Sequence, residues 1–66
     1  MKQIKGYARK ATPYGQVWII RIRDMEAART INLNEMTGWS VEDAKRKFNR
    51  RLESFGHTIS DIEIEA

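Results

Sequence analysis

The sequence predicts a small α+β domain, in which an antiparallel sheet of three to four strands packs one amphipathic helix on one face, in the order β-β-β-α-β. Three observations predict this fold class. Apolar residues recur at helical spacing between Ser40 and Gly56. The run from Val17 to Ile22 is rich in β-branched and aromatic residues, which is typical of a central strand. The second half of the segment from His57 to Glu65 alternates isoleucine with acidic residues, as a strand with one wet face does.

The predicted helix has a clear beginning and a clear end. Ser40 is the expected N-cap, because its hydroxyl can accept a hydrogen bond from an unpaired N–H of the first turn, and Asp43 completes a short capping box. Gly56 supplies the left-handed residue that commonly closes a helix. The apolar stripe expected to face the sheet consists of Val41, Ala44, Phe48, Leu52 and Phe55.

The first two strands are predicted to form a hairpin. Lys2 to Thr12 is the first strand, and Gly6 marks a bulge or a place where another group packs closely. Thr12 to Gly15 is the turn, and Gln16 to Arg23 is the central strand. We expect Trp18 to be part of the core, since an aromatic residue inside an apolar strand normally buries its area; the alternative is an exposed platform for a nucleic-acid base.

The region before the helix is predicted to hold a third strand, from Arg29 to Asn34, because its residues alternate. Arg23 to Ala28 is then a loop or wide turn, with one helical turn at its end as the alternative. Trp39 directly precedes the N-cap, where an apolar residue often packs back on the first turn.

After the helix, the last strand is expected to enter parallel to the first, which gives the sheet order 4-1-2-3. Ile59 is out of phase with Ile62 and Ile64, which should point inward, so a bulge or a late strand start is expected.

Length and composition restrict the class of protein. The chain of 66 residues is expected to be a single domain over 1–66, near the lower limit for a self-sufficient core. It has no cysteine, so neither disulfides nor thiolate-bound metal can support that core. No window approaches the ~20 apolar residues of a membrane span, and the start MKQIKGYARK has no apolar run. We therefore expect a cytoplasmic protein that does not enter the membrane.

The residues do not assemble an active site, and we expect that the protein is not an enzyme and uses no cofactor, metal or small-molecule substrate. His57 is the only histidine, and no spacing gives it a catalytic partner; its expected role is structural, beside the helix C-terminus. Glu63 and Glu65 are interpreted as the solvated side of an end strand. The glycines are scattered and form no phosphate-binding loop.

The charge pattern points to a binding protein. The net charge is +3, from twelve Lys and Arg against nine Asp and Glu, and basic residues dominate the first 23 positions and the helix. Such a balance permits binding to nucleic acid or to an acidic protein surface. The candidate partner-binding residues are Lys45, Arg46, Lys47, Arg50 and Arg51 on the helix, and Tyr7, Arg9, Tyr14 and Arg21 on the strands and their turn.

Two resemblances give these residues a context. The succession W-I-I-R-I, R-T-I-N-L and S-V-E-D-A-K-R-K-F resembles the arm-binding domains at the N-termini of tyrosine-type phage integrases. That resemblance implies a DNA-binding domain in which the sheet, more than the helix, is applied to the major groove. The acidic strand after the helix departs from that family.

The β-β-β-α-β order, with a helix that opens in S-V-E-D-A and a final strand I-E-I-E, also looks like small phage or plasmid accessory domains, such as a phage inhibitor of host RNA polymerase and several anti-CRISPR proteins. This resemblance implies a non-enzymatic factor that binds and modulates a host protein or complex with an acidic surface. It is the leading expectation from the sequence, and nucleic-acid binding through the basic helix and the sheet is the alternative.

Overall fold

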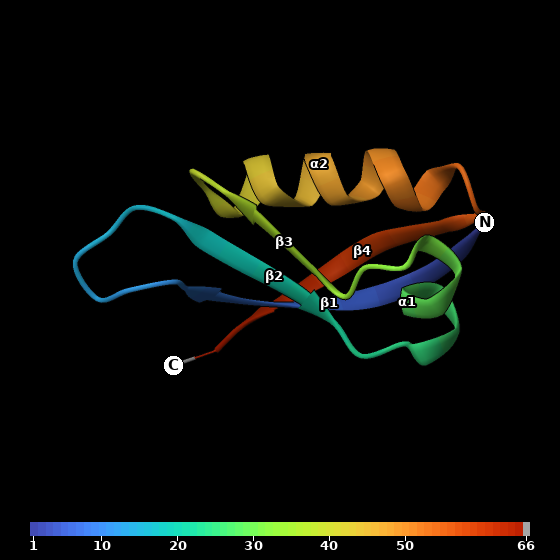
Figure 1. Ribbon diagram of the computed structural model, residues 1–66, viewed down its shortest axis with the longest axis horizontal. Coiled ribbons are helices and arrows are strands. Elements are labelled where there is room, and N and C mark those ends of the chain that lie inside the picture. Colours follow the sequence, from blue (N-terminus) through green and yellow to red (C-terminus); the bar gives the residue numbers. More distant parts are fainter. Residues whose placement is uncertain (66) are drawn as a thin grey trace.

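The computed structural model describes residues 1–65 and has the predicted α+β architecture, with a four-stranded mixed sheet, a long helix on one face and a short helix at one end (Figure 1). The elements are β1 (Lys2–Lys10), β2 (Trp18–Ile22), α1 (Met25–Ile31), β3 (Glu35–Gly38), α2 (Val41–Glu53) and β4 (His57–Ile64). Within residues 1–65, neither helix is long and apolar enough to cross a bilayer.

The sheet order is β3-β2-β1-β4, which is the predicted order 4-1-2-3. β2 is antiparallel to both β1 and β3, and β4 runs parallel to β1. The expected irregularity in the last strand is present: Ile4 pairs with Ile59 and Lys5 with Asp61, so that Ser60 is the extra residue. This bulge lets Ile59 point into the core even though it is out of phase with Ile62.

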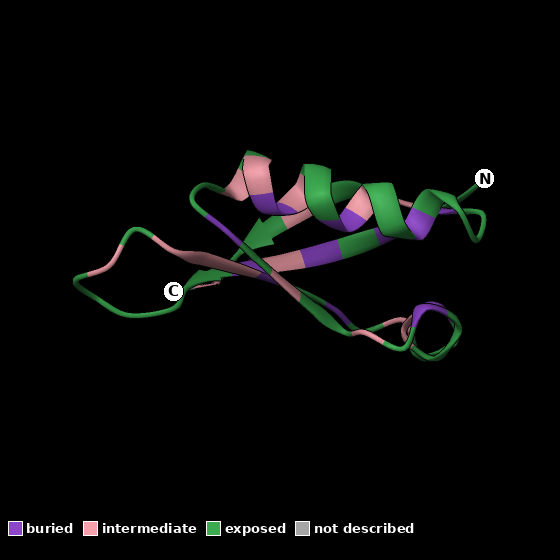
Figure 2. Ribbon diagram, turned by 45° about the horizontal axis from the view of Figure 1, so that its top comes forward, coloured by how far each residue is buried: buried purple, intermediate pink, exposed green. Residues whose placement is uncertain are grey.

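α2 covers one face of the sheet. Ala44, Phe48 and Leu52 have no exposed surface, and they pack in one core cluster with Ile20 and Ile59 (Figure 2). The outer side of the helix is largely exposed (Figure 2). The predicted apolar stripe is therefore confirmed from Val41 to Leu52, but not for its last member, Phe55.

Two residues near the ends of elements, Phe55 and Ile64, were predicted to face the core but are exposed. Phe55 is 51% exposed, because α2 ends at Glu53 and the following turn no longer keeps the helical phase. Ile64 is 57% exposed, since β4 is an edge strand that begins beside the C-terminal end of α2 and runs away from the helix (Figure 1).

The N-cap of α2 is formed as the sequence predicts, whereas its C-cap is Ser54 and the predicted Gly56 lies two residues beyond that cap. Ser40 has an extended backbone, and its Oγ accepts a hydrogen bond from Asp43 N–H at 3.0 Å. Gly56 follows the helix with a φ of 82°, a conformation that glycine adopts at little steric cost.

The predicted third strand from Arg29 to Asn34 is wrong, because its first three residues belong to helix α1 and its last three to the turn that follows. Asp24 caps α1 by accepting a hydrogen bond from Ala27 N–H at 3.0 Å. Ala27 and Ile31, one turn apart, are both buried in the core. Their i, i+4 spacing therefore determines the structure of this segment, in place of the short strand-like alternation that ends at Leu33. The third strand comes later, at Glu35–Gly38.

Candidate functional site

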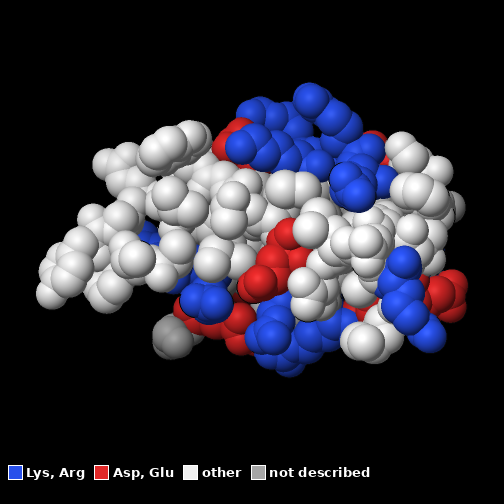
Figure 3. Space-filling model, viewed as in Figure 1, with Lys and Arg blue, Asp and Glu red and all other residues white. Residues whose placement is uncertain are grey.

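Apart from Tyr14, which lies in the turn between β1 and β2, the candidate residues fall on two surfaces on opposite sides of the molecule. The helix surface is the outer side of α2, and it appears as a basic band along the top of Figure 3. The open face is the side of the sheet that faces away from α2, and within residues 1–65 no helix packs on it (Figure 1). The helix surface consists of Lys45, Arg46, Lys47, Arg50 and Arg51, and the open face includes Lys5, Tyr7, Arg9, Arg21 and Arg23.

Three of the five cations of the helix surface are engaged within the protein. Arg46 Nη2 lies 2.7 Å from Asp43 Oδ1, and Lys47 Nζ lies 3.4 Å from Asp43 Oδ2. The Arg51 guanidinium donates two hydrogen bonds, of 3.1 and 3.3 Å, to the Ile31 carbonyl at the end of α1. Arg51 is therefore a structural link between the two helices.

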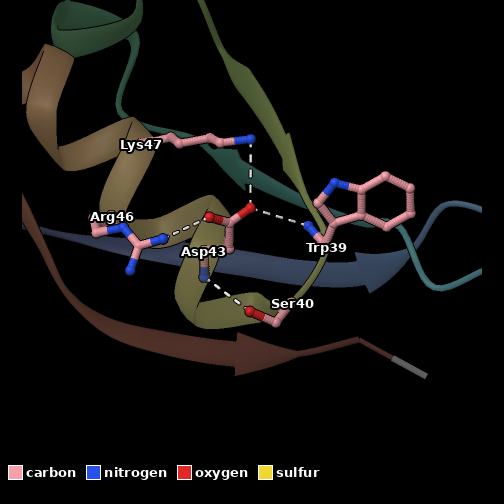
Figure 4. Close-up of polar contacts among 5 residues, drawn as sticks. All are labelled: Trp39, Ser40, Asp43, Arg46 and Lys47. Carbon is pink, nitrogen blue, oxygen red and sulfur yellow. Dashed lines mark hydrogen bonds and ion pairs between the residues drawn. The ribbon is translucent and has the colours of Figure 1, made fainter.

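Asp43 organises the beginning of α2 (Figure 4). Its Oδ2 accepts a hydrogen bond of 3.1 Å from the backbone N–H of Trp39, one residue before the cap, whereas the predicted capping box would reach Ser40. This hydrogen bond, followed by the contacts with Lys47 and Arg46, holds the pKa of the Asp43 carboxyl below its ordinary value. The carboxylate is thus a fixed negative charge among the cations of the helix surface.

The open face brings Tyr7 and Arg21 together, since they are direct partners on β1 and β2. The Arg23 guanidinium carbon lies 3.9 Å from the centroid of the Tyr7 ring, and Lys5 Nζ lies 5.5 Å from it. Both distances are in the range of cation–π contacts. Because the Arg23 guanidinium already lies against the Tyr7 ring, the ring helps to position Arg23 and is poorly placed to stack on a base.

Carboxylates of the C-terminal segment neutralise the neighbouring part of the open face. Lys5 Nζ lies 2.9 Å from Glu63, and Arg23 Nη2 lies 3.3 Å from Glu65. The hydrogen bond between Lys5 and Glu63 raises the pKa of the lysine and lowers that of the glutamic acid. Arg9 and Arg21 form no ion pair within residues 1–65, so they are the cations of the open face available to a partner.

The β1–β2 hairpin, residues 2–22, extends past the end of α2 (Figure 1). At its tip, Thr12 Oγ1 accepts a hydrogen bond from Gly15 N–H at 2.9 Å, and Tyr14 is 98% exposed. Trp18 is half-buried against the core, as predicted, and Lys10 Nζ lies 5.8 Å from its ring. The hairpin therefore presents Lys10 and Tyr14 beyond the body of the domain.

Trp39, like Phe55, is an exposed aromatic residue that was predicted to pack against the protein. Its side chain is 71% exposed and points away from Asp43 and α2, so it does not pack on the first turn (Figure 4). The alternation of β3 contains the signal that was missed. Met36 and Gly38 point towards the core, so the residue after Gly38 points outward.

The remaining candidates offer little room for chemistry. His57 is 6% exposed, and its Nδ1 has no hydrogen-bond partner among the described residues. A shallow depression of about 260 Å³ lies at the end of α1, lined by Ala28, Arg29, Asn32, Leu33 and Asn34. Among residues 1–65, no three His, Asp or Glu side chains are grouped closely enough to hold a metal ion.

Comparisons with known proteins give no relative. No family model, no curated protein and no solved structure matches the chain. The geometry and the charges of the chain itself are therefore the basis on which a function is inferred.

Proposed function

We propose that the chain is a non-enzymatic nucleic-acid-binding module that works through its β1–β2 hairpin and the adjoining open face. The observation that carries the proposal is the segregation of charge. Residues 1–23 contain six Lys and Arg and no Asp or Glu, whereas the other 43 residues contain six Lys and Arg and nine Asp and Glu. The first segment has a charge of +6 and the remainder a charge of −3, and the +6 segment is the one that forms the hairpin.

Such a hairpin suits a phosphate backbone. Arg9 and Arg21 lie on the open face, whereas Lys10 pairs with Trp18 at the end of β1 and lies on the other side of the hairpin. None of them has a carboxylate partner within residues 1–65, so binding a phosphate breaks no internal ion pair. Each phosphate they neutralise releases counterions, which gives an affinity that falls steeply with salt.

The resemblance to integrase arm-binding domains supports the same surface. That family is expected to apply its sheet to nucleic acid, and here β1, β2 and β3 form an antiparallel sheet with α2 behind it and the open face in front. The acidic strand β4 lies beside β1, at the side away from β3. It would repel phosphates there, which favours contact nearer the hairpin tip.

A second candidate function is binding of a host protein with an acidic surface, in the manner expected of phage accessory factors. The observation that favours it is the helix surface, where Lys45 and Arg50 form no ion pair within residues 1–65. This surface lies on the other side of the molecule from the open face, so the two functions predict different sensitive residues.

Two matched double variants test the proposal. Arg9→Ala with Arg21→Ala removes two cations from the open face, and Lys45→Ala with Arg50→Ala removes two from the helix surface. Binding of labelled duplex and single-stranded DNA would be measured by fluorescence anisotropy at about 50 and 200 mM salt, the range over which phosphate contacts weaken.

The proposal predicts that the Arg9/Arg21 variant loses affinity at every sequence and that its log–log salt slope falls by about 1.4 to 1.8, as for two lost phosphate contacts. The Lys45/Arg50 variant should keep most of the wild-type slope. A larger loss in the Lys45/Arg50 variant would overturn the assignment to the hairpin. Absence of wild-type binding to either form of DNA at the lower salt would overturn the function and leave the protein partner.

A further inference from the structure

Trp39 is exposed, yet its backbone is held on both sides. The preceding residue, Gly38, pairs with Trp18 in the sheet, and the Trp39 N–H itself is bound by Asp43 at 3.1 Å. The indole therefore projects into solvent from a fixed point, and its 71% exposure does not come from a loose loop (Figure 4). A large aromatic side chain that is exposed and pre-positioned has the properties of a binding anchor, because little backbone entropy is lost when it is covered.

The position of Trp39 connects it with the hairpin. β3 ends beside the first residue of β2, so Trp39 lies at the same end of the molecule as the hairpin tip (Figure 1). In the view of Figure 3 this end is largely white, and Lys and Arg show only in small areas behind and below it. Residues 11–17 contain no Asp, Glu, Lys or Arg, and they include the exposed Tyr14; Arg9 and Lys10 come directly before them in the sequence.

This end of the molecule combines the two groups that a single nucleic-acid strand requires, which are aromatic faces for bases and cations for phosphates. We infer that it binds unpaired bases of a single-stranded nucleic acid, with one base stacked on Trp39 and the backbone held by Arg9 and Lys10, which lie on the two sides of the hairpin. The inference deepens the proposed function and rests on it. Tyr14 provides a second aromatic side chain for a neighbouring base.

A duplex does not fit the indole equally well. In a double helix each base face is covered by the next base pair, so an exposed indole can stack only after a base is unstacked. The sequence left open a stacking role for Trp18, but Trp18 is half-buried against the core and Lys10 lies near its ring. Trp39 is the tryptophan whose ring is accessible.

Fluorescence reports on Trp39 directly, because the chain has only two tryptophans. In the variant Trp18→Phe, Trp39 is the single tryptophan, and in the variant Trp39→Phe, Trp18 is the single tryptophan. Each would be titrated with oligothymidylate of about 12 nucleotides, within the usual site size of stacking proteins. Stacking predicts saturable quenching in the Trp18→Phe protein and little change in the Trp39→Phe protein.

Affinity provides the second measurement, with an exposed aromatic at the other end of α2 as the matched control. Trp39→Ala should weaken oligothymidylate binding roughly 5- to 150-fold, the range expected for one lost stacked base. Phe55→Ala should leave it within about twofold, since Phe55 lies far from the hairpin. Circular dichroism and thermal melting would confirm that all variants are folded.

Several outcomes would overturn the inference. One is an oligothymidylate affinity of Trp39→Ala equal to that of the wild type, and another is absence of quenching when Trp39 is the single emitter. Preference of the wild-type protein for duplex over single strand at equal salt would also overturn it. In each of these cases the proposed function survives if Arg9→Ala with Arg21→Ala still loses DNA binding. If the wild-type protein binds neither form of DNA, both proposals fall.

Discussion

Gly38 lies directly against the backbone of Ala44, so that β3 touches the first turn of α2 without an intervening side chain. A Cβ atom built on Gly38 would lie 2.5 Å from Ala44 N and 2.8 Å from its Cα. Both of these atoms are backbone, which cannot move aside as the end of a flexible side chain can. The absence of a side chain at position 38 therefore sets the distance between the edge strand and the helix.

Gly38→Ala should destabilise the protein by about 3 kcal/mol or more, because strand and helix must separate. Gly6→Ala is the comparison. Its Cβ would lie 3.1 Å from methyl groups of Ile20 and Ile59, which are side-chain atoms with some freedom to move. Urea unfolding should show a clearly smaller loss for Gly6→Ala, and equal losses would contradict this account of Gly38.

Leu52→Ala should lower the free energy of unfolding by ~2–5 kcal/mol, because Leu52 has no exposed surface and its truncation leaves a cavity. That is a large fraction of the stability available to a domain of this size. Thermal unfolding measures the loss. A melting temperature equal to that of the wild type would mean that the inner side of α2 is assigned wrongly.

Ser40→Ala should remove ~1 kcal/mol of stability through loss of the hydrogen bond from Asp43 N–H to the hydroxyl oxygen. Ser40→Thr keeps the hydroxyl and should recover most of that stability. Nucleic-acid binding by the Ser40→Ala protein, measured well below its melting temperature, should match that of the wild type. A selective loss of binding would indicate that the cap has a direct functional role.

Asp43 should make the free energy of unfolding depend on pH in the acidic range. Its pKa is lower in the folded protein than its ordinary value of 3.8, so it contributes stability above that value and loses it as the pH falls through the folded-state pKa. The wild-type protein should therefore lose stability more steeply on acidification than Asp43→Asn does. Melting temperatures between neutral pH and about pH 3 measure the difference, and identical pH profiles would contradict it.

Charge reversal at Arg46 and Arg50 separates the two candidate functions. The two residues are one turn apart, and both are exposed on the helix surface, so the fold should survive Arg46→Glu with Arg50→Glu. The only ion pair lost within residues 1–65 is that between Arg46 and Asp43. The nucleic-acid proposal predicts that Arg46→Glu with Arg50→Glu loses less DNA affinity than Arg9→Glu with Arg21→Glu. If the Arg46/Arg50 variant loses more, the helix surface is favoured as the binding surface.

The sequence predicted the fold well where the local pattern and the packing agree. α2 has caps at both ends and a regular stripe, and the sheet order follows from short connections and from the return of the chain through the helix. α1 was predicted only as an alternative, and only as a single turn before Arg29, because Ile31 and Leu33 alternate as in a strand. A helix forms because Ala27 and Ile31, one turn apart, are both buried, and their burial depends on the tertiary core.

The candidate site was less predictable, because net charge does not show which cations are already bonded. The sequence places Arg46, Lys47 and Arg51 together with Lys45 and Arg50, and only the structure shows that three of the five contact Asp43 or a carbonyl. Whether an aromatic residue is covered depends on neighbours far away in the chain. This is why the exposure of Trp39 was not foreseen.

The parallel pairing of β1 with β4 joins strands that are more than fifty positions apart in sequence, as in the pair Lys2 and His57. A contact of such high sequence separation requires closure of a long loop before it gives any stabilisation, so it slows folding. The ribosome makes β4 after every other described element. Until then, the β1 edge that β4 will cover exposes unpaired amides and carbonyls, so the nascent chain is open to strand exchange and aggregation during this interval.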